Sequence, residues 1–162
     1  MNKHQMPSDS SLSDCKIHLA IPRQIKAVAG LLATQLDEHG ILSTKTALTK
    51  NLALVARRKS LGFVLVLTDS RREVIGAALG CSQMSLEHGG ISGWLEEFYI
   101  LPKFRNRGLG ERMLNEFIKT AKKLGWRAID LEVDAHHRRV ISLYRRSGFT
   151  ELPRRRLVRS LT

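Results

Sequence analysis

The chain has 162 residues, of which 43% are hydrophobic and 26% are charged, a composition typical of one globular domain. No apolar run approaches the roughly 18 residues that a membrane-spanning helix needs, so a membrane partner is not expected. Two cysteines are too few for a disulfide framework and are typical of the reducing cytoplasm, where we expect the protein to reside. Residues 1–13 are polar and are predicted to be a disordered lead-in to one domain over 14–162.

The formal net charge of +12 predicts attraction to anions. Basic residues are spread along the chain in pairs and triplets, such as Arg154-Arg155-Arg156. The pattern is compatible with a solvated surface, an anionic ligand or a nucleic-acid partner. The nine aromatic residues (two Trp, two Tyr and five Phe) are not interleaved with the basic runs as stacking platforms, so nucleic acid is the less favoured partner.

Residues 15–101 are predicted to form a strand, two helices and three further strands. Residues 15–20 alternate in hydrophobicity and predict a strand, which leads into a helix over about 23–38. A second helix over about 43–58 begins with Ser43 or Thr44 as its N-cap. Turn sequences then separate three predicted strands, over 61–69, 74–86 and 91–101.

The clearest helix pattern lies over about 108–124, with one apolar and one charged face. It precedes a predicted strand over 127–133, a short helix over 136–148 and one or two edge strands within 149–161. Strands 91–101 and 127–133, joined by a helix, must be parallel with a right-handed crossover. The sequence therefore predicts an α/β (α+β) fold with a mixed sheet of about six or seven strands and about four helices.

The segment "RNRGLGE" (105–111) stands between a strand and the clearest helix. A helix N-terminus presents unpaired N–H groups and about half a positive charge, so it binds anions. Gly108 and Gly110 would let a diphosphate approach the backbone, and two arginines add charge. A dinucleotide loop would need a third glycine where Met113 stands, and a Walker loop would need Gly-Lys-Ser/Thr. The segment is thus predicted to bind phosphates by a third type of loop.

A strand, "R-x-x-G-x-G", a helix, a strand and a short helix bearing "LYRRSGF" together resemble the GNAT superfamily of N-acetyltransferases. The resemblance covers about residues 15–160, and it implies that the phosphates belong to acetyl-CoA as co-substrate. It also implies that the pantetheine arm pairs with strand 91–101 where this strand and 127–133 splay apart. The cofactor-binding residues implied in this way are Phe98, Tyr99, Ile100, Arg105, Asn106, Arg107, Gly108, Leu109, Gly110, Glu111, His137 and Tyr144.

An acetyl acceptor amine must lose a proton, because an alkyl amine is only about one part in a thousand neutral at pH 7. The stretch "LEEFYILP" resembles the "LEDIYVMP" style of the polyamine and diamine N-acetyltransferase branch. This resemblance implies that Glu96 is the catalytic base and that Glu97 binds the substrate. Since a strand alternates faces, only one of them is expected to point into a given site. The alternative for either is an exposed carboxylate paired with an arginine.

Tyr144 matches the family tyrosine in "SLYRRSGF", which implies a catalytic role as proton donor to the leaving thiolate. The alternative is a core aromatic residue on the stripe with Val140 and Leu143. The family usually has Asn and Ala where this chain has His137 and Val140, although His137 retains the capacity to hydrogen-bond pantetheine. The histidines lack partners at metal-ligand spacing, and His136 is adjacent to His137, so no metal is predicted.

The resemblance places the acceptor pocket at two segments, 35–42 and 151–160. The first offers Asp37 and Glu38 to a cationic amine, whereas the second is strongly basic. The predicted reaction is direct transfer of the acetyl group of acetyl-CoA to a primary amine in a ternary complex. The acceptor is either a small-molecule amine or a protein amine, such as a ribosomal N-terminus or lysine. The alternative is a non-catalytic RNA- or ribosome-binding module, and a homodimer is left open.

Overall fold

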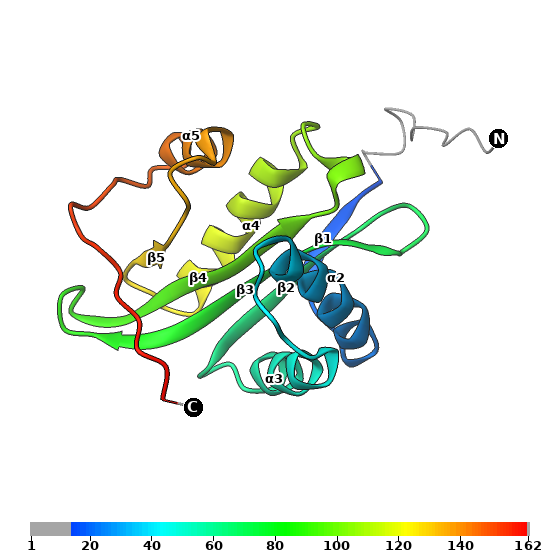
Figure 1. Cartoon of the computed structure of the whole chain (residues 1–162), viewed down its shortest axis with the longest axis horizontal. Helices are drawn as coiled ribbons and strands as arrows, with labels where there is room; N and C mark the ends of the chain where they lie inside the picture. The colour runs from blue at the N-terminus through cyan, green and yellow to red at the C-terminus, as the bar shows by residue number, and fades with distance from the viewer. Residues whose placement is uncertain (1–13, 162) are drawn as a thin grey trace. The chain divides into compact units, whose positions relative to one another are not determined.

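The computed structural model describes residues 14–161, so the predicted lead-in over 1–13 lies outside the described residues. The chain forms two compact units, Met1–Glu132 and Val133–Thr162. The first unit contains a sheet, three helices and two short 3-10 helices, and the second contains one helix (Figure 1). The strands are β1 Lys16–Leu19, β2 Gly62–Thr68, β3 Val74–Ser85, β4 Gly90–Ile100 and β5 Ile129–Leu131. The helices are η1 Pro22–Gln24, α2 Ile25–Glu38, α3 Lys45–Arg57, η2 Pro102–Phe104, α4 Leu109–Lys123 and α5 Arg138–Arg146.

The sheet has the strand order β1-β2-β3-β4-β5. All neighbouring strands are antiparallel except β4 and β5, so the predicted parallel pair joined by a helix is confirmed. The mixed α/β class and the four α-helices are also confirmed. Among residues 14–161, however, the sheet has five strands and not six or seven.

The predicted edge strands within 149–161 are the reason for the difference, because this segment forms no strand. Pro153 has no N–H to donate to a ladder, and three successive arginines follow it. Leu157, Val158 and Leu161 are 91%, 89% and 90% exposed. Their apolar side chains therefore bury no surface against a sheet and do not stabilise a strand. An extended segment without a strand partner has no ladder hydrogen bonds to hold it in a sheet.

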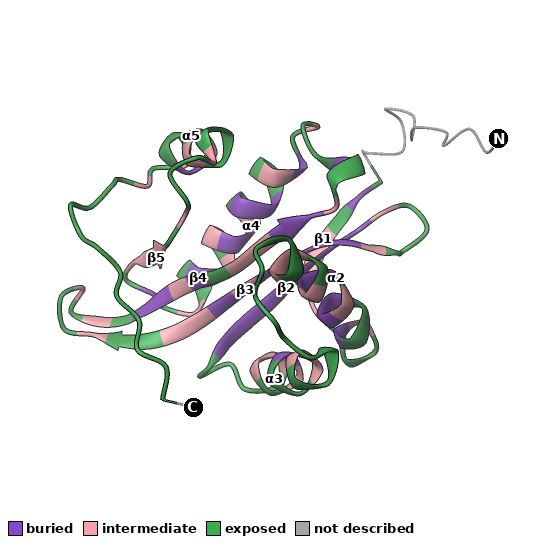
Figure 2. Ribbon diagram, in the orientation of Figure 1, coloured by how far each residue is buried: buried purple, intermediate pink, exposed green. Residues whose placement is uncertain are grey.

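Helices α2 and α3 cover one face of the sheet. Helix α2 packs against β3 and β4, and α3 packs against β2. Every residue of β2 is buried, as Figure 2 shows along its whole length. A strand buried on both faces reads as a continuous apolar run, which is why 61–69 was predictable as a buried strand.

Aromatic side chains fill the other face of the sheet under α4. The ring of Phe117 on α4 lies 4.7 Å from that of Phe63 on β2, and Trp126 lies 5.2 Å from Phe63. Glycines on the sheet make room for these rings: a Cβ at Gly93 would stand 1.8 Å from the ring of Trp126. The small residues of β3 and β4 therefore let α4 and the segment after it lie close to the sheet.

The predicted helix ends agree with the structure to within about two residues. The Thr44 hydroxyl caps α3 by accepting a hydrogen bond from the backbone N–H of Ala47 at 3.2 Å. Glycines bracket α4, since Gly108 precedes it and Gly125 follows it, both with φ of 76°. That left-handed conformation favours glycine at both positions. Within 14–161 no helix has the length and apolarity needed to cross a membrane.

Candidate functional site

An irregularity in β4 sets the geometry around the two adjacent glutamates. Residue pairing with β3 runs from Leu79 opposite Glu97 to Gly80 opposite Leu95, so Glu96 is an extra residue. This is a β-bulge, which interrupts the alternation of side chains and bends the strand. Glu96 is exposed and Glu97 is half-buried. The two carboxylates therefore occupy different environments. The cause is the bulge, and not the regular alternation of side chains along a strand that we had expected.

Glu97 has a strongly altered acidity. Its pKa is raised to about 7 by burial in the first place and by the neighbouring Glu96 carboxylate in the second. A hydrogen bond from the side chain of Gln35 on α2 acts in the opposite direction. A carboxyl group with a pKa near 7 is partly ionised at neutral pH and can both accept and release a proton. Such a shift at a partly exposed position is typical of functional groups.

The side chain of Gln35 also carries a buried oxygen without a donor. Its Oε1 atom is the one buried side-chain polar atom, among the described residues, that has no hydrogen-bond partner. Leaving such an atom unpaired costs about 1–3 kcal/mol.

Tyr99 joins β4 to the end of α2. Its hydroxyl donates a hydrogen bond of 2.7 Å to Oε1 of Glu38, the residue that we expected to bind the substrate. Burial is the main cause of the raised pKa of Tyr99, and the hydrogen bond to Glu38 adds to it. The phenol therefore stays protonated and keeps the Glu38 carboxylate in place. Asp37, also expected to bind the substrate, is exposed at the end of α2.

Arg105, the first residue of the predicted phosphate loop, packs against Tyr99. Its guanidinium carbon stands 4.9 Å from the centre of the Tyr99 ring, and its Nε donates to the backbone oxygen of Ile100 at 2.7 Å. Because Nε of Arg105 already has an acceptor, only the terminal nitrogens of its guanidinium group are left for the expected contact with a phosphate. The arginine also braces the turn that leads from β4 to α4.

The predicted loop 105–111 has the geometry of an uncapped helix start. Gly108 is the N-cap of α4, and glycine has no side chain with which to cap the first N–H groups. A Cβ at Gly108 would meet no atom within 4 Å. Leu109, the first residue of α4, is buried, so its side chain anchors the start of the helix in the core. The other predicted cofactor-binding residues of this loop lie on both sides of Gly108. Asn106, which has a positive φ of 61°, and Arg107 precede it, and Gly110 and Glu111 lie in the first turn of α4.

The second unit contains the two remaining predicted site residues, His137 and Tyr144. His137 is the N-cap of α5. Tyr144 is buried, with its ring centre 5.5 Å from that of Phe149. Burial raises the pKa of Tyr144 to about 12. Its hydroxyl therefore remains protonated throughout the physiological range.

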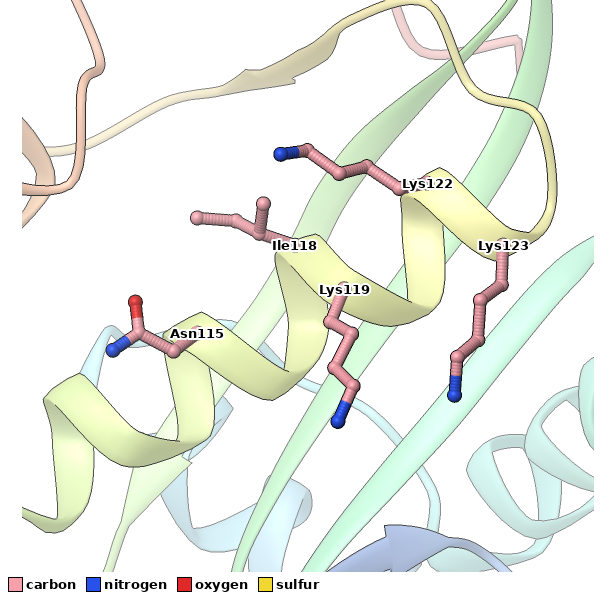
Figure 3. A pocket seen from close by; sticks show the side chains of 5 residues that line it. All are labelled: Asn115, Ile118, Lys119, Lys122 and Lys123. Carbon is pink, nitrogen blue, oxygen red and sulfur yellow. The ribbon is translucent and has the colours of Figure 1, made fainter.

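Two features of the structure had not been predicted. Asp134, His136 and His137 place their ligand atoms within 4.8 Å of one another, although their spacing in the sequence had suggested no metal cluster. A hollow of about 440 Å³ lies along α4 (Figure 3). It is lined by Asn115, Ile118, Lys119, Lys122 and Lys123, so its charge is positive.

Known proteins share both the sequence pattern and the fold. Residues 30–149 match the model of the acetyltransferase (GNAT) family. The chain belongs to this family. It is 39% identical over 57 residues to an uncharacterized N-acetyltransferase of Methanocaldococcus jannaschii, a match that spans 35% of this chain and 25% of that relative. The chain thus matches about a quarter of that relative's length.

Solved structures share the fold of this chain. An integron cassette protein from the metagenome of a Cole Harbour salt marsh superposes with a TM-score of 0.79 at 23% identity, over 90% of each chain. An aminoglycoside N-acetyltransferase in complex with CoA gives a TM-score of 0.76 at 16% identity, over 91% of this chain and 95% of that chain. At these identities the likeness concerns the fold alone.

Glu97→Gln is expected to stabilise the protein at high pH and not at low pH. The folded-state pKa of Glu97, about 7, lies above its ordinary value of 4.5, so ionisation between these values costs stability. The variant has no such cost. In urea unfolding, the difference in unfolding free energy between variant and parent should be independent of pH below about pH 4.5. At pH 8.5 it should be more favourable to the variant by on the order of 1 kcal/mol, which is less than the full pKa shift implies because Glu97 is partly exposed to solvent.

The exposed neighbour supplies the control for this measurement. Glu96→Gln should show a smaller gain at pH 8.5, because it removes only the lesser of the two causes of the Glu97 shift. A stability difference between Glu97→Gln and the parent that stays constant from pH 4.5 to 8.5 would contradict the assignment.

Proposed function

We propose that this GNAT protein transfers the acetyl group of acetyl-CoA to a primary amine by direct attack within a ternary complex. The single observation that carries the proposal is Glu97, half-buried at the β4 bulge with its pKa raised to about 7. Such a proton acceptor suits an amine, which must lose a proton during the reaction.

Glu97 is a better candidate for the base than Glu96, to which the sequence had given the role. Proton transfer from an alkyl ammonium group to an ordinary glutamate is uphill by about six pKa units, and the rise of the Glu97 pKa from 4.5 to about 7 removes about 2.5 of them. Glu96 is exposed, and its charge raises the pKa of Glu97. In this mechanism Glu96 tunes the base, and Glu97 accepts the amine proton directly or through water.

The reaction forms a C–N bond and breaks the C–S bond of the thioester. Glu97 accepts one proton from the ammonium group, and the neutral nitrogen attacks the carbonyl carbon. As the C–S bond breaks, the second proton of the nitrogen leaves with the CoA thiolate. An acyl-enzyme on Cys81 is disfavoured, because burial and the nearby Glu96 raise the pKa of this thiol and keep it protonated. Cys15 is buried and its pKa is also raised, chiefly by burial. Direct attack needs neither thiol.

The acceptor proposed here is a cationic amine of the kind used by the polyamine and diamine branch of the family. Three carboxylates support this choice: Glu96 and Glu97 on β4, and Glu38, which is held by Tyr99 at the end of α2. They form an acidic region in a chain of net charge +12. A protein N-terminus or lysine is the alternative acceptor, because each also presents an ammonium group.

The acetyl-CoA diphosphate is assigned to the 105–111 loop, and one pair of variants tests this assignment. Gly108→Asp adds a carboxylate at the α4 N-terminus, and two like charges about 4 Å apart cost a few kcal/mol near a surface. The acetyl-CoA Kd should therefore rise by about tenfold or more in calorimetry. Gly125→Asp is the matched control, since Gly125 has the same φ of 76° and equally open surroundings at the other end of α4.

The two loop variants also separate binding from folding. Acidic residues at a helix N-terminus are stabilising, so Gly108→Asp should stay folded by thermal denaturation. Parent-like affinity in Gly108→Asp, or an equal loss in Gly125→Asp, would place the diphosphate elsewhere.

The pH dependence of turnover with a diamine acceptor distinguishes the two glutamates. Glu97→Gln removes the base, so kcat should fall by about 10² or more near pH 7 and recover partly as rising pH supplies neutral amine. Glu96→Gln should keep the plateau rate and move the acidic limb of kcat/KM to lower pH, because it removes a charge that raises the pKa of Glu97. The reverse pattern would return the base to Glu96.

Tyr144 is proposed as the hydrogen-bond donor to the departing thiolate. Its pKa of about 12 lies about 3.5 units above that of an ordinary thiol, so complete proton transfer is uphill and stabilisation by a hydrogen bond is the expected contribution. Tyr144→Phe keeps the ring beside Phe149 and removes the donor. Acetyl-CoA affinity should hold while kcat falls by about 10². A parental kcat would make Tyr144 a core residue only.

A further inference from the structure

Three potential metal ligands gather in the turn that precedes α5. The Asp134 carboxylate and the imidazoles of His136 and His137 each place one ligand atom within 4.8 Å of the other two. The backbone N–H of His137 donates to the backbone carbonyl oxygen of Asp134 at 2.9 Å. The backbone N–H of Arg138 donates to the backbone carbonyl oxygen of His136, also at 2.9 Å. These hydrogen bonds close the turn, so the cluster is a product of local backbone geometry.

The ligand set favours one class of metal ion. Two imidazole nitrogens and one carboxylate oxygen suit Zn²⁺ and similar transition metals, whereas Mg²⁺ and Ca²⁺ prefer oxygen ligands. Ligand atoms about 2.1 Å from a tetrahedral zinc ion stand about 3.4 Å apart, so side-chain rotation has to close at most about 1.4 Å. Asp134 and His136 are exposed, which gives an ion direct access from solvent.

We propose that Asp134, His136 and His137 bind a divalent transition-metal ion and that the bound ion excludes acetyl-CoA. The exclusion rests on the proposed function, in which acetyl-CoA binds this chain, and on the pantetheine contact that the family resemblance implies for His137, with an imidazole nitrogen as the acceptor of that hydrogen bond. An imidazole nitrogen that ligates a metal has given its lone pair to the ion and cannot accept a hydrogen bond with it. The family usually has Asn at this position, and an amide is a much poorer zinc ligand than imidazole.

Neighbouring charges set the expected strength of the site. Arg138 and Arg139 begin α5 directly after the cluster and oppose the approach of a cation. The ligands also lie near the surface, where water completes the coordination of the ion. We therefore expect reversible binding, weaker than that of a buried structural zinc site, and thus responsive to the concentration of metal.

Calorimetry on the untagged full chain tests the site without any assay of activity. Zn²⁺ should bind with one-to-one stoichiometry, and Mg²⁺ should give no heat at the same concentrations. Loss of an outer partner of a metal site already costs about 10- to 100-fold in affinity, so His136→Ala should weaken Zn²⁺ binding by at least about tenfold. His18→Ala, which removes a histidine on β1, should leave it unchanged. Equal zinc affinity in the parent and His136→Ala would overturn the site.

The exclusion is tested by titrating acetyl-CoA with and without zinc. At a zinc concentration ten times its own Kd, mutual exclusion raises the apparent acetyl-CoA Kd by about 11-fold. His136→Ala should bind acetyl-CoA normally, because His137 remains, and the same zinc concentration should raise its apparent Kd by about twofold at most. Acetyl-CoA is preferred to CoA, whose free thiol binds zinc. An unchanged acetyl-CoA Kd in saturating zinc would overturn the exclusion. Failure of the chain to bind acetyl-CoA would instead refute the proposed function, while the zinc titration would still decide the site.

Discussion

The structure of the candidate site depends on one constraint, the change in pairing of β4 at residues 95–97. Up to Leu95 this strand pairs with β3 on one edge and with β5 on the other. Parallel pairing with β5 ends at Leu95, and the bulge at Glu96 follows immediately. The remainder of β4 is held by β3 and by side chains from α2 and Arg105. A strand with this arrangement can present carboxylates while its core face stays packed.

Charge in this protein is organised locally against its overall sign. The net charge of +12 includes three lysines around the α4 hollow, whereas the carboxylates of Glu38 and Glu97 lie where α2 meets β4. Exposed charges more than about 8 Å apart interact weakly at physiological salt. An amine in contact with β4 therefore experiences the nearby carboxylates more strongly than the distant basic residues. For the proposed amine acceptor, the overall charge would act on its approach and the local acids on its binding.

The sequence was sufficient for elements whose patterns are local. The apolar stripe of α4, its flanking glycines and the continuous apolar run of β2 each predicted an element that the structure contains. The strands expected within 149–161 failed because a strand depends on a partner, which alternation alone does not supply. The bulge left a signal that could have been recognised, since two successive acids in "LEEFY" break the alternation expected of a half-buried strand.

Contacts between distant segments were not predictable in the same way. The sequence offered Glu38 as a substrate ligand but gave no reason to connect it to Tyr99, 61 residues away. Gln35 showed no distinguishing pattern, because an amide on a helix is ordinary until its oxygen is found buried beside a carboxylate. The turn that brings Asp134 near His137 likewise depends on backbone hydrogen bonds, which residue spacing alone does not reveal.

Burial acts on the two proposed catalytic groups with different chemical consequences. For both Glu97 and Tyr144 it is the main cause of a raised pKa, to about 7 and about 12 respectively. A carboxylate becomes a stronger base when its pKa rises toward the pH of the reaction. A phenol becomes a weaker acid, but it also remains a hydrogen-bond donor across the pH range from about 7 to 12, in which the carboxylate is ionised. One physical effect therefore separates the two titrations by about five pKa units and leaves one group a proton acceptor and the other a hydrogen-bond donor near neutral pH.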